Sequence, residues 1–162
     1  MHHETAAASP LKGVHHIGLT VRDLEESIRF YRDILGMTVV RRRRIQEDYV
    51  SQQTGFDGVT LDAASLHIRA GVSPSIEIVQ YVSHAGEPAV PSTNRPGTSH
   101  LCLTTDDLRA AHRTLSAQGV RFKSDPVHIT AGPNTGGLVA YFLDPDGYTL
   151  ELFQPPSDKE NH

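Results

Sequence analysis

Two histidines and two glutamates occupy matched places in the chain and have the chemistry of metal ligands. His16 and His100 each stand in a short alternating segment, and Glu77 and Glu151 each stand between two aliphatic residues. A carboxylate in an apolar strand is costly to bury unless another group compensates its charge. Two neutral imidazoles and two carboxylates neutralise a divalent ion, and this ligand set suits Zn, Ni, Co, Mn or Fe. We therefore predict that these four residues together hold one divalent metal ion.

The metal hypothesis depends on an internal repeat. The segment 13–24 resembles the segment 97–108, and His16 matches His100 at the same offset as Asp23 matches Asp107. Considered alone, each histidine is more simply a strand residue with a satisfied side chain, and each glutamate is an exposed residue on an edge strand. The repeat favours metal binding, because without a metal a separate explanation would be needed at each of four matched positions.

Each half of the chain is predicted to fold as a strand, a helix and three further strands. Alternation places the side chains of His16 and Thr20 on one face of the first strand, and it does the same for His100, Cys102 and Thr104 in the second half. Helices are expected over 23–35 and 107–119, because each range begins with an aspartate cap and is closed by a glycine. The later strands are expected at 37–45, 59–69, 75–82, 120–123, 137–144 and 148–154, with a type I turn over 144–147.

These elements predict an α+β fold, in which two paired β-α-β-β-β modules form one structural domain. The expected segments are a flexible N-terminal segment (1–12), the first module (13–82), a linker (83–96), the second module (97–155) and a polar tail (156–162). The linker is rich in proline, glycine and serine, which favour irregular structure.

Composition narrows the possible partners and compartments. The formal net charge of −4 gives no general electrostatic reason to bind nucleic acid. No apolar run approaches the length of a membrane span, and the first ten residues do not resemble a secretory signal. Cys102 is the only cysteine, which excludes an internal disulfide and suits a reducing, cytoplasmic location. We therefore expect a small-molecule substrate, with no nucleic acid and no membrane as partners.

Two longer motifs resemble those of a known superfamily. The opening motif is His16-Ile-Gly-Leu-Thr-Val-Arg-Asp-Leu-Glu, followed by Phe30-Tyr31 and Leu35-Gly36-Met37, and the closing motif is Asp144-Pro-Asp-Gly-Tyr-Thr-Leu-Glu-Leu152. Both are similar to motifs of the vicinal oxygen chelate superfamily, which includes glyoxalase I, methylmalonyl-CoA epimerase, extradiol dioxygenases and bleomycin-resistance proteins. The resemblance covers about 13–155. It implies modules whose sheets curve into an open barrel around a metal, ligands at the same four positions, and a homodimer.

The ligand set then separates the chemistries of the superfamily. The extradiol dioxygenases use two histidines and one carboxylate, without an equivalent of Glu77, whereas four ligands resemble the set of glyoxalase I. The epimerase differs by a glutamine at the position of Glu77. We therefore expect a glyoxalase I-like or epimerase-like lyase or isomerase that polarises a small oxygenated carbonyl compound and moves its α-proton through a metal-bound enolate, with Glu151 or Glu77 as general base. The alternatives are an extradiol-type ring-cleaving dioxygenase and a non-catalytic drug or natural-product binding protein of the bleomycin-resistance type.

Several polar residues are candidates for shaping a pocket. The run Arg41 to Arg44 lies in a predicted strand, so alternation divides it two to each face. A solvated edge or a dimer rim is the favoured interpretation of this run, although an anionic substrate would be consistent with it. His15 is expected to share the face of Ile17 and to be structural. Further candidates in strands and loops are Tyr49, Gln52, Gln53, His67, Arg69 and Asn134.

Overall fold

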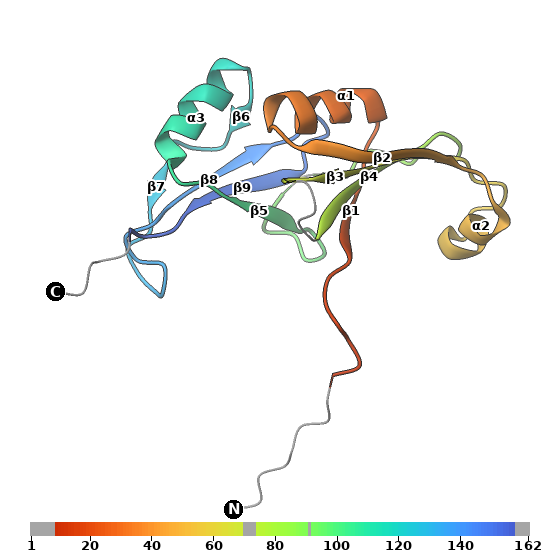
Figure 1. Ribbon diagram of the computed structural model, residues 1–162, viewed down its shortest axis with the longest axis horizontal. Helices are drawn as coiled ribbons and strands as arrows, with labels where there is room; N and C mark the ends of the chain where they lie inside the picture. The colour runs from red at the N-terminus through yellow and green to blue at the C-terminus, as the bar shows by residue number, and fades with distance from the viewer. Residues whose placement is uncertain (1–8, 70–73, 91, 158–162) are drawn as a thin grey trace, which may run out of the picture.

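The computed structural model describes residues 9–69, 74–90 and 92–157, so most of the expected N-terminal segment and polar tail lies outside the described residues. Figure 1 shows two groups of strands, with α1 and α3 on one side of them and α2 at the outer end of the first group. The first module contains β1 (His16–Thr20), α1 (Leu24–Ile28), η1 (Arg29–Ile34), β2 (Thr38–Ile45), α2 (Asp48–Thr54), β3 (Leu61–His67) and β4 (Ser75–Tyr81). The second contains β5 (His100–Thr104), α3 (Leu108–Ala117), β6 (Arg121–Phe122), β7 (Val127–His128), β8 (Leu138–Leu143) and β9 (Thr149–Gln154).

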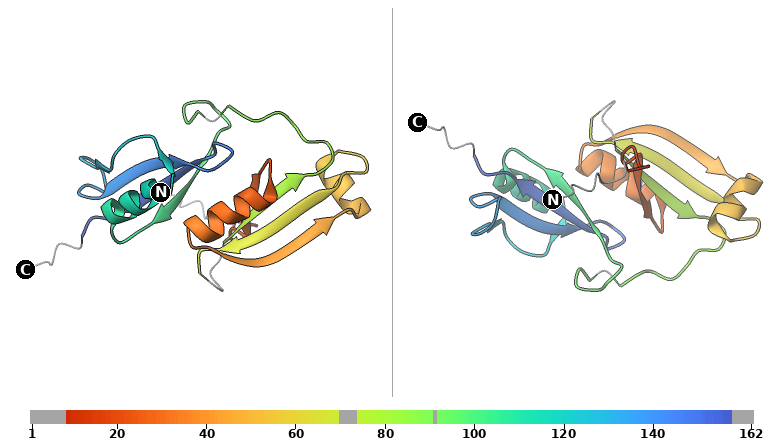
Figure 2. Two further views of the ribbon diagram at one scale, coloured as in Figure 1. Left: turned by 90° about the horizontal axis from the view of Figure 1, so that it is seen from above. Right: turned by 90° about the horizontal axis from the view of Figure 1, so that it is seen from below.

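Each module builds one open sheet, and the two sheets have the same topology. The strand orders are β1-β4-β3-β2 and β5-β9-β8-β6, with β7 also pairing with β8. In each sheet the first and last strands pair in parallel, while the remaining pairs are antiparallel. The predicted α+β class with paired modules is confirmed, and the sheets remain open (Figure 2). This topology lays each histidine strand directly beside the glutamate strand of its own module.

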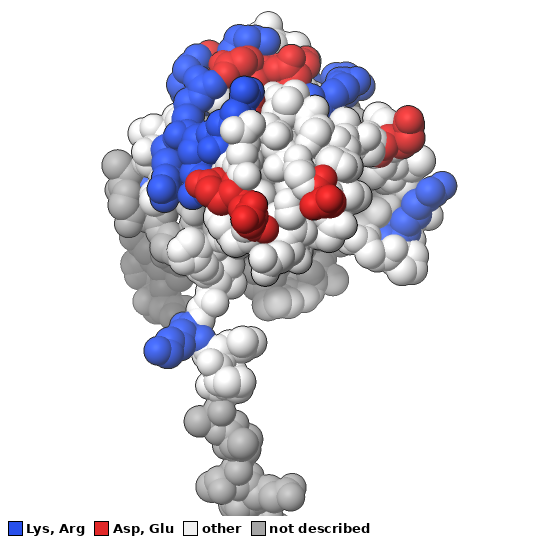
Figure 3. Space-filling model, turned by 90° about the vertical axis from the view of Figure 1, so that its right-hand side faces the viewer, with Lys and Arg blue, Asp and Glu red and all other residues white. Residues whose placement is uncertain are grey.

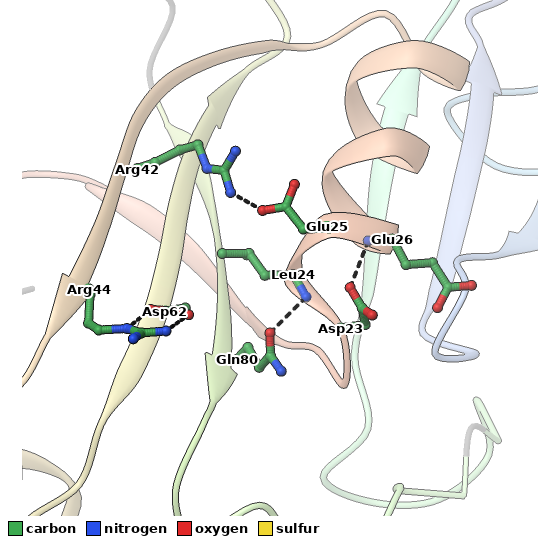
Figure 4. Close-up of polar contacts among 8 residues, drawn as sticks. All are labelled: Asp23, Leu24, Glu25, Glu26, Arg42, Arg44, Asp62 and Gln80. Atoms are coloured by element: carbon green, nitrogen blue, oxygen red, sulfur yellow. Dashed lines mark hydrogen bonds and ion pairs between the residues drawn. The ribbon is translucent and has the colours of Figure 1, made fainter.

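Both module helices begin at the predicted aspartate caps. The side chains of Asp23 and Asp107 each accept a hydrogen bond from an amide in the first helical turn, at 2.9 Å. A second contact was not predicted: Gln80 Oε1 accepts a bond from the Leu24 amide at 3.0 Å (Figure 4). Gln154 makes the matching contact with the first residue of α3 at 2.8 Å. Each helix start is therefore fixed to the strand that carries the glutamate of its module.

The helices differ from the prediction in two places. The range expected as one helix is α-helical only in α1 and continues as the π-helical η1, whose Phe30 and Tyr31 are buried. The helix α2 lies between the predicted strands 37–45 and 59–69, where no element was predicted. Only Val50 is buried in it, so it has no apolar stripe that predicts a helix. No helix in the described part of the chain is long and apolar enough to cross a membrane.

A single core and one turn join the two modules. Side chains from both modules pack in the same apolar cluster, including Leu19, Ile28 and Tyr31 from the first and Leu108, Phe142 and Leu150 from the second. The predicted turn over 144–147 forms, with its closing bond from the Gly147 amide to the Asp144 carbonyl at 3.0 Å. Its side chains reach the first module: the Tyr31 hydroxyl donates to Asp144 Oδ2 at 2.9 Å, and the Arg22 amide donates to Asp146 Oδ2 at 3.0 Å.

Candidate metal centre

The first histidine and the first glutamate meet on the exposed face of their sheet. In the parallel ladder, Glu77 is opposite Gly18, so it lies diagonally across from His16. The His16 Nε2 atom is 3.6 Å from Glu77 Oε2, and the two side chains are 44% and 34% exposed. Because Gly18 has no side chain, nothing on β1 fills the space between the ring and the carboxylate. The predicted alternation of β1 is confirmed, since Leu19 is buried on the other face.

The second pair repeats this arrangement with a tighter contact. Glu151 is opposite Cys102 in the ladder of β5 and β9, and it lies diagonally across from His100. The His100 Nε2 atom is 2.9 Å from Glu151 Oε2, and the Glu151 side chain is only 15% exposed. Burial, followed by the neighbouring Glu151 carboxylate, raises the pKa of Cys102 and the pKa of Tyr141. The Tyr141 ring also contacts the His100 ring, with centroids 5.3 Å apart.

His15 does not take the structural place expected for it. The strand β1 begins at His16, so the alternation that assigned His15 to the face of Ile17 does not extend back to it. Its Nδ1 atom is instead 2.8 Å from His16 Nδ1. One of these two nitrogens carries the proton that the other accepts. His15 is therefore a neighbour of the first pair that the sequence pattern did not identify.

The first pair opens into a cavity of about 430 Å³ that is lined by the first module. Its floor is the exposed face of the sheet, and α2 closes one end with Tyr49 and Gln53. Arg41 and Arg43 line it from β2. Of the other pocket candidates, Gln52, His67, Arg69 and Asn134 lie outside this lining. The short helix α2, which was not predicted, therefore supplies two of the expected pocket residues.

The spacing of donors within each pair fits a single ion, but the two pairs are separate in one chain. Ligands about 2.1 Å from a metal lie about 3.0 Å from each other at adjacent octahedral positions and about 3.4 Å at tetrahedral ones. The nitrogen–oxygen distances of 3.6 and 2.9 Å are close to this range. Within the described ranges, no group of three or more His, Cys, Asp and Glu side chains is placed to hold a metal. Each pair is thus half of the predicted ligand set.

Comparison with known proteins adds to this geometry. A family model described as the Glyoxalase/Bleomycin resistance protein/Dioxygenase superfamily matches residues 13–152. A 2-epi-5-epi-valiolone epimerase from Actinomyces sp is 31% identical over 89% of this chain and 80% of its own length. A lactoylglutathione lyase from Haemophilus influenzae is 30% identical over 89% of this chain and 93% of its own length. A glyoxalase family protein from Bacillus cereus has a similar structure, with a TM-score of 0.78, 17% identity, and coverage of 93% of this chain and 98% of its own.

Proposed function

Because the chain belongs to the glyoxalase/bleomycin resistance protein/dioxygenase superfamily, we propose that it is a metal-dependent enzyme that moves the α-proton of a small oxygenated carbonyl compound. Relatives named as an epimerase and as lactoylglutathione lyases support glyoxalase I-like or epimerase-like chemistry. The observation that carries the proposal is the duplicated pair, in which one histidine and one glutamate converge in each module. A set of two imidazoles and two carboxylates fits Zn, Ni, Co, Mn or Fe.

The complete metal site is proposed to form between two copies of the chain. His16 and Glu77 of one copy and His100 and Glu151 of the other would hold the ion, because the two pairs of a single chain do not converge. β1 and β5, the strands of the two histidines, each stand at the edge of their sheet, where a second copy can approach. A two-fold axis that joins one pair to the other creates two identical sites per dimer.

The residues around each pair can orient the histidine rings. If His16 carries its proton on Nδ1 and donates it to His15, its Nε2 atom is left free on the side of Glu77. In the second module, the contact with the Tyr141 ring limits the rotation of His100. Both arrangements keep the Nε2 atom of the histidine on the side where the carboxylate of the same pair lies.

The proton transfer itself is assigned to a carboxylate. A divalent ion at this site would supply Lewis acidity that polarises a substrate carbonyl. A proton on the adjacent carbon then becomes acidic enough for Glu151 or Glu77 to accept it, and the same carboxylate can return it to a neighbouring carbon. Four protein ligands leave room for a substrate with two adjacent oxygen atoms.

Metal analysis combined with proton exchange tests the proposal. The full chain is reloaded separately with Zn, Ni, Co, Mn and Fe(II), and its metal content is measured after removal of free ions. We expect about one equivalent per chain for the metals that support exchange. The loaded protein is then incubated in deuterium oxide with α-hydroxyketones, hemithioacetals and acyl thioesters, and deuterium at the α-carbon is measured by mass spectrometry.

Three results would contradict the proposal. The first is less than about half an equivalent of every metal after reloading. The second is full metal content with oxygen consumption on a catechol in place of exchange, which would favour ring cleavage. The third is tight binding of a large aromatic natural product by metal-free protein, which would favour a binding protein.

A further inference from the structure

We propose that Arg41 and Arg43 form an anion-binding subsite in the cavity of the first pair, so that the substrate carries a carboxylate or phosphate group. The proposal deepens the function proposed above and rests on it for the site at which the substrate reacts. The observation that supports it is that the four arginines of the run divide between the two faces of β2.

Two arginines of the run are already neutralised on the helix side of the sheet. The Arg44 guanidinium makes two bonds to the Asp62 carboxylate, each 2.7 Å long, and Arg42 pairs with Glu25 of α1 (Figure 4). The guanidinium of Arg44 accordingly lowers the pKa of Asp62. These two arginines have their counter-ions within the chain. Half of the run is therefore explained by solvated surface ion pairs.

The other two arginines line the cavity and are less closely paired with carboxylates than Arg42 and Arg44. Arg43 donates to the Tyr49 hydroxyl at 2.6 Å, and its closest carboxylate, that of Glu47, is 3.8 Å away. Among the residues that the structure describes, Arg41 has no carboxylate within 4.0 Å. Figure 3 shows Lys and Arg side chains gathered along one side of the end of the molecule that carries α2, with Asp and Glu side chains beside them at the top and bottom of the group. The chain as a whole has a net charge of −4, so this positive cluster is local.

The sheet register connects the arginines to the first pair. Arg41 is opposite Ser65, and Ser65 is opposite Glu77, so these three residues form one row across the sheet. Arg43 stands in the next row on the same face of the sheet, opposite Ala63. Neighbouring strands lie about 4.8 Å apart, which places the backbone of Arg41 about 10 Å from that of Glu77. The positions between them carry the small side chains of Ser65 and Ala63.

This geometry suits a small molecule that contacts both ends of the row. One end presents the histidine and the carboxylate of the first pair, and the other presents two guanidinium groups. A guanidinium donates two parallel hydrogen bonds to a carboxylate or a phosphate, which a neutral group does not match. Tyr49 holds Arg43 in place before a ligand arrives, and the Arg43 side chain is only 33% exposed. A half-buried, positioned arginine binds an anion more strongly than a freely solvated one.

The test is a binding measurement with simple probes on the full chain at low ionic strength, because salt screens exposed charges. The probes are glutarate, inorganic phosphate and glutaramide, which is an uncharged analogue of glutarate. Affinities are measured by titration of amide NMR signals in β2 and β3. Glutarate or phosphate is expected to bind and glutaramide to bind at least about tenfold more weakly. The stronger of the two anions identifies the class of acid group.

Two double variants provide a matched comparison. Arg41→Gln with Arg43→Gln removes the proposed subsite, whereas Arg42→Gln with Arg44→Gln removes the same charge from the same strand but from its other face. The first is expected to weaken anion binding at least about tenfold and the second to leave it nearly unchanged. Equal binding by the first variant and the wild type, an equal loss in both variants, or binding of glutaramide as tight as that of the stronger anion would overturn the proposal.

Metal content measured on the same samples separates the two proposals. If anion binding depends on Arg41 and Arg43 although the protein holds no metal, the result supports the anion subsite and contradicts the proposed function. If the protein holds its metal and anion binding is independent of Arg41 and Arg43, the subsite fails and the proposed function stands.

Discussion

Replacing Glu151 with glutamine is expected to leave a folded protein that exchanges the α-proton of its substrate roughly 100- to 10,000-fold more slowly. The amide has nearly the same shape as the carboxylate, so the packing of this largely buried side chain is preserved, but an amide does not accept a proton at neutral pH. Deuterium incorporation measures the exchange. Metal content and thermal unfolding of the same sample show whether the variant lacks only its general base or has also lost its metal site or its fold.

Glu77→Gln is the matched comparison, because it removes the same charge from the other pair. A loss of exchange confined to Glu151→Gln assigns the base to Glu151, and a loss confined to Glu77→Gln transfers this role to Glu77. A loss in both, with metal retained, indicates that both carboxylates are needed. Normal exchange in both variants would contradict a glutamate as the base.

Replacing Tyr31 with phenylalanine is expected to lower the free energy of unfolding by about 2 kcal/mol at neutral pH, because hydrogen bonds to buried charged groups contribute about this much. The Tyr31 hydroxyl donates to Asp144 Oδ2 at 2.9 Å, and the Asp144 side chain is buried where the two modules meet. The bond therefore stabilises both the turn over 144–147 and the packing of one module on the other. Chemical denaturation at several pH values measures the loss.

The size of this loss should depend on pH in a defined direction. Burial raises the pKa of Asp144, and the bond from Tyr31 partly offsets that rise by stabilising the ionised form. A raised pKa in the folded state means that stability falls as pH increases from the ordinary aspartate pKa through the raised value. Without the Tyr31 hydroxyl the pKa of Asp144 should rise further. The variant should therefore lose most stability at pH values above this range and least at pH values below it.

Asp144→Asn supplies the control for this pH dependence. The asparagine keeps an acceptor for the Tyr148 amide, which donates to Asp144 Oδ1 at 2.7 Å, but it does not titrate. In an Asp144→Asn background, Tyr31→Phe should cause a loss that is the same at every pH. A loss that still grows with pH in that background would show that another group is responsible.

The sequence was sufficient to predict how each pair forms. A period of two places His16 on the exposed face of β1, and it places Glu77 on the face opposite that of its buried neighbours Ile76 and Ile78. The repeat then predicts the same arrangement for His100 and Glu151. Gln80 and Gln154 were missed, although each follows the glutamate of its module by three residues, and a comparison extended along these strands would have found both.

The relation between the two pairs could not be predicted in the same way. Strand alternation fixes the face on which a side chain lies, but it contains no information about how one sheet sits against another. Contacts between distant residues, such as Tyr31 with Asp144, set that relation, and neither residue signals the contact in its local pattern. The position of His15 was wrong for a related reason, because a period of two holds only within the strand.

Mixing two inactive variants tests most directly the central claim that the metal centre combines one pair from each of two copies. One variant carries His16→Ala and Glu77→Ala, and the other carries His100→Ala and Glu151→Ala. Each variant alone has no complete ligand set in any arrangement of its copies. In a mixed dimer, however, the intact first pair of one chain meets the intact second pair of the other.

The two variants are co-expressed or refolded together, and metal content and proton exchange are then measured. With random pairing, half of the dimers are mixed and each has one complete site, so we predict roughly one quarter of the wild-type metal content and exchange rate per chain. A mixture that holds no more metal and exchanges no faster than the separate variants would contradict the account.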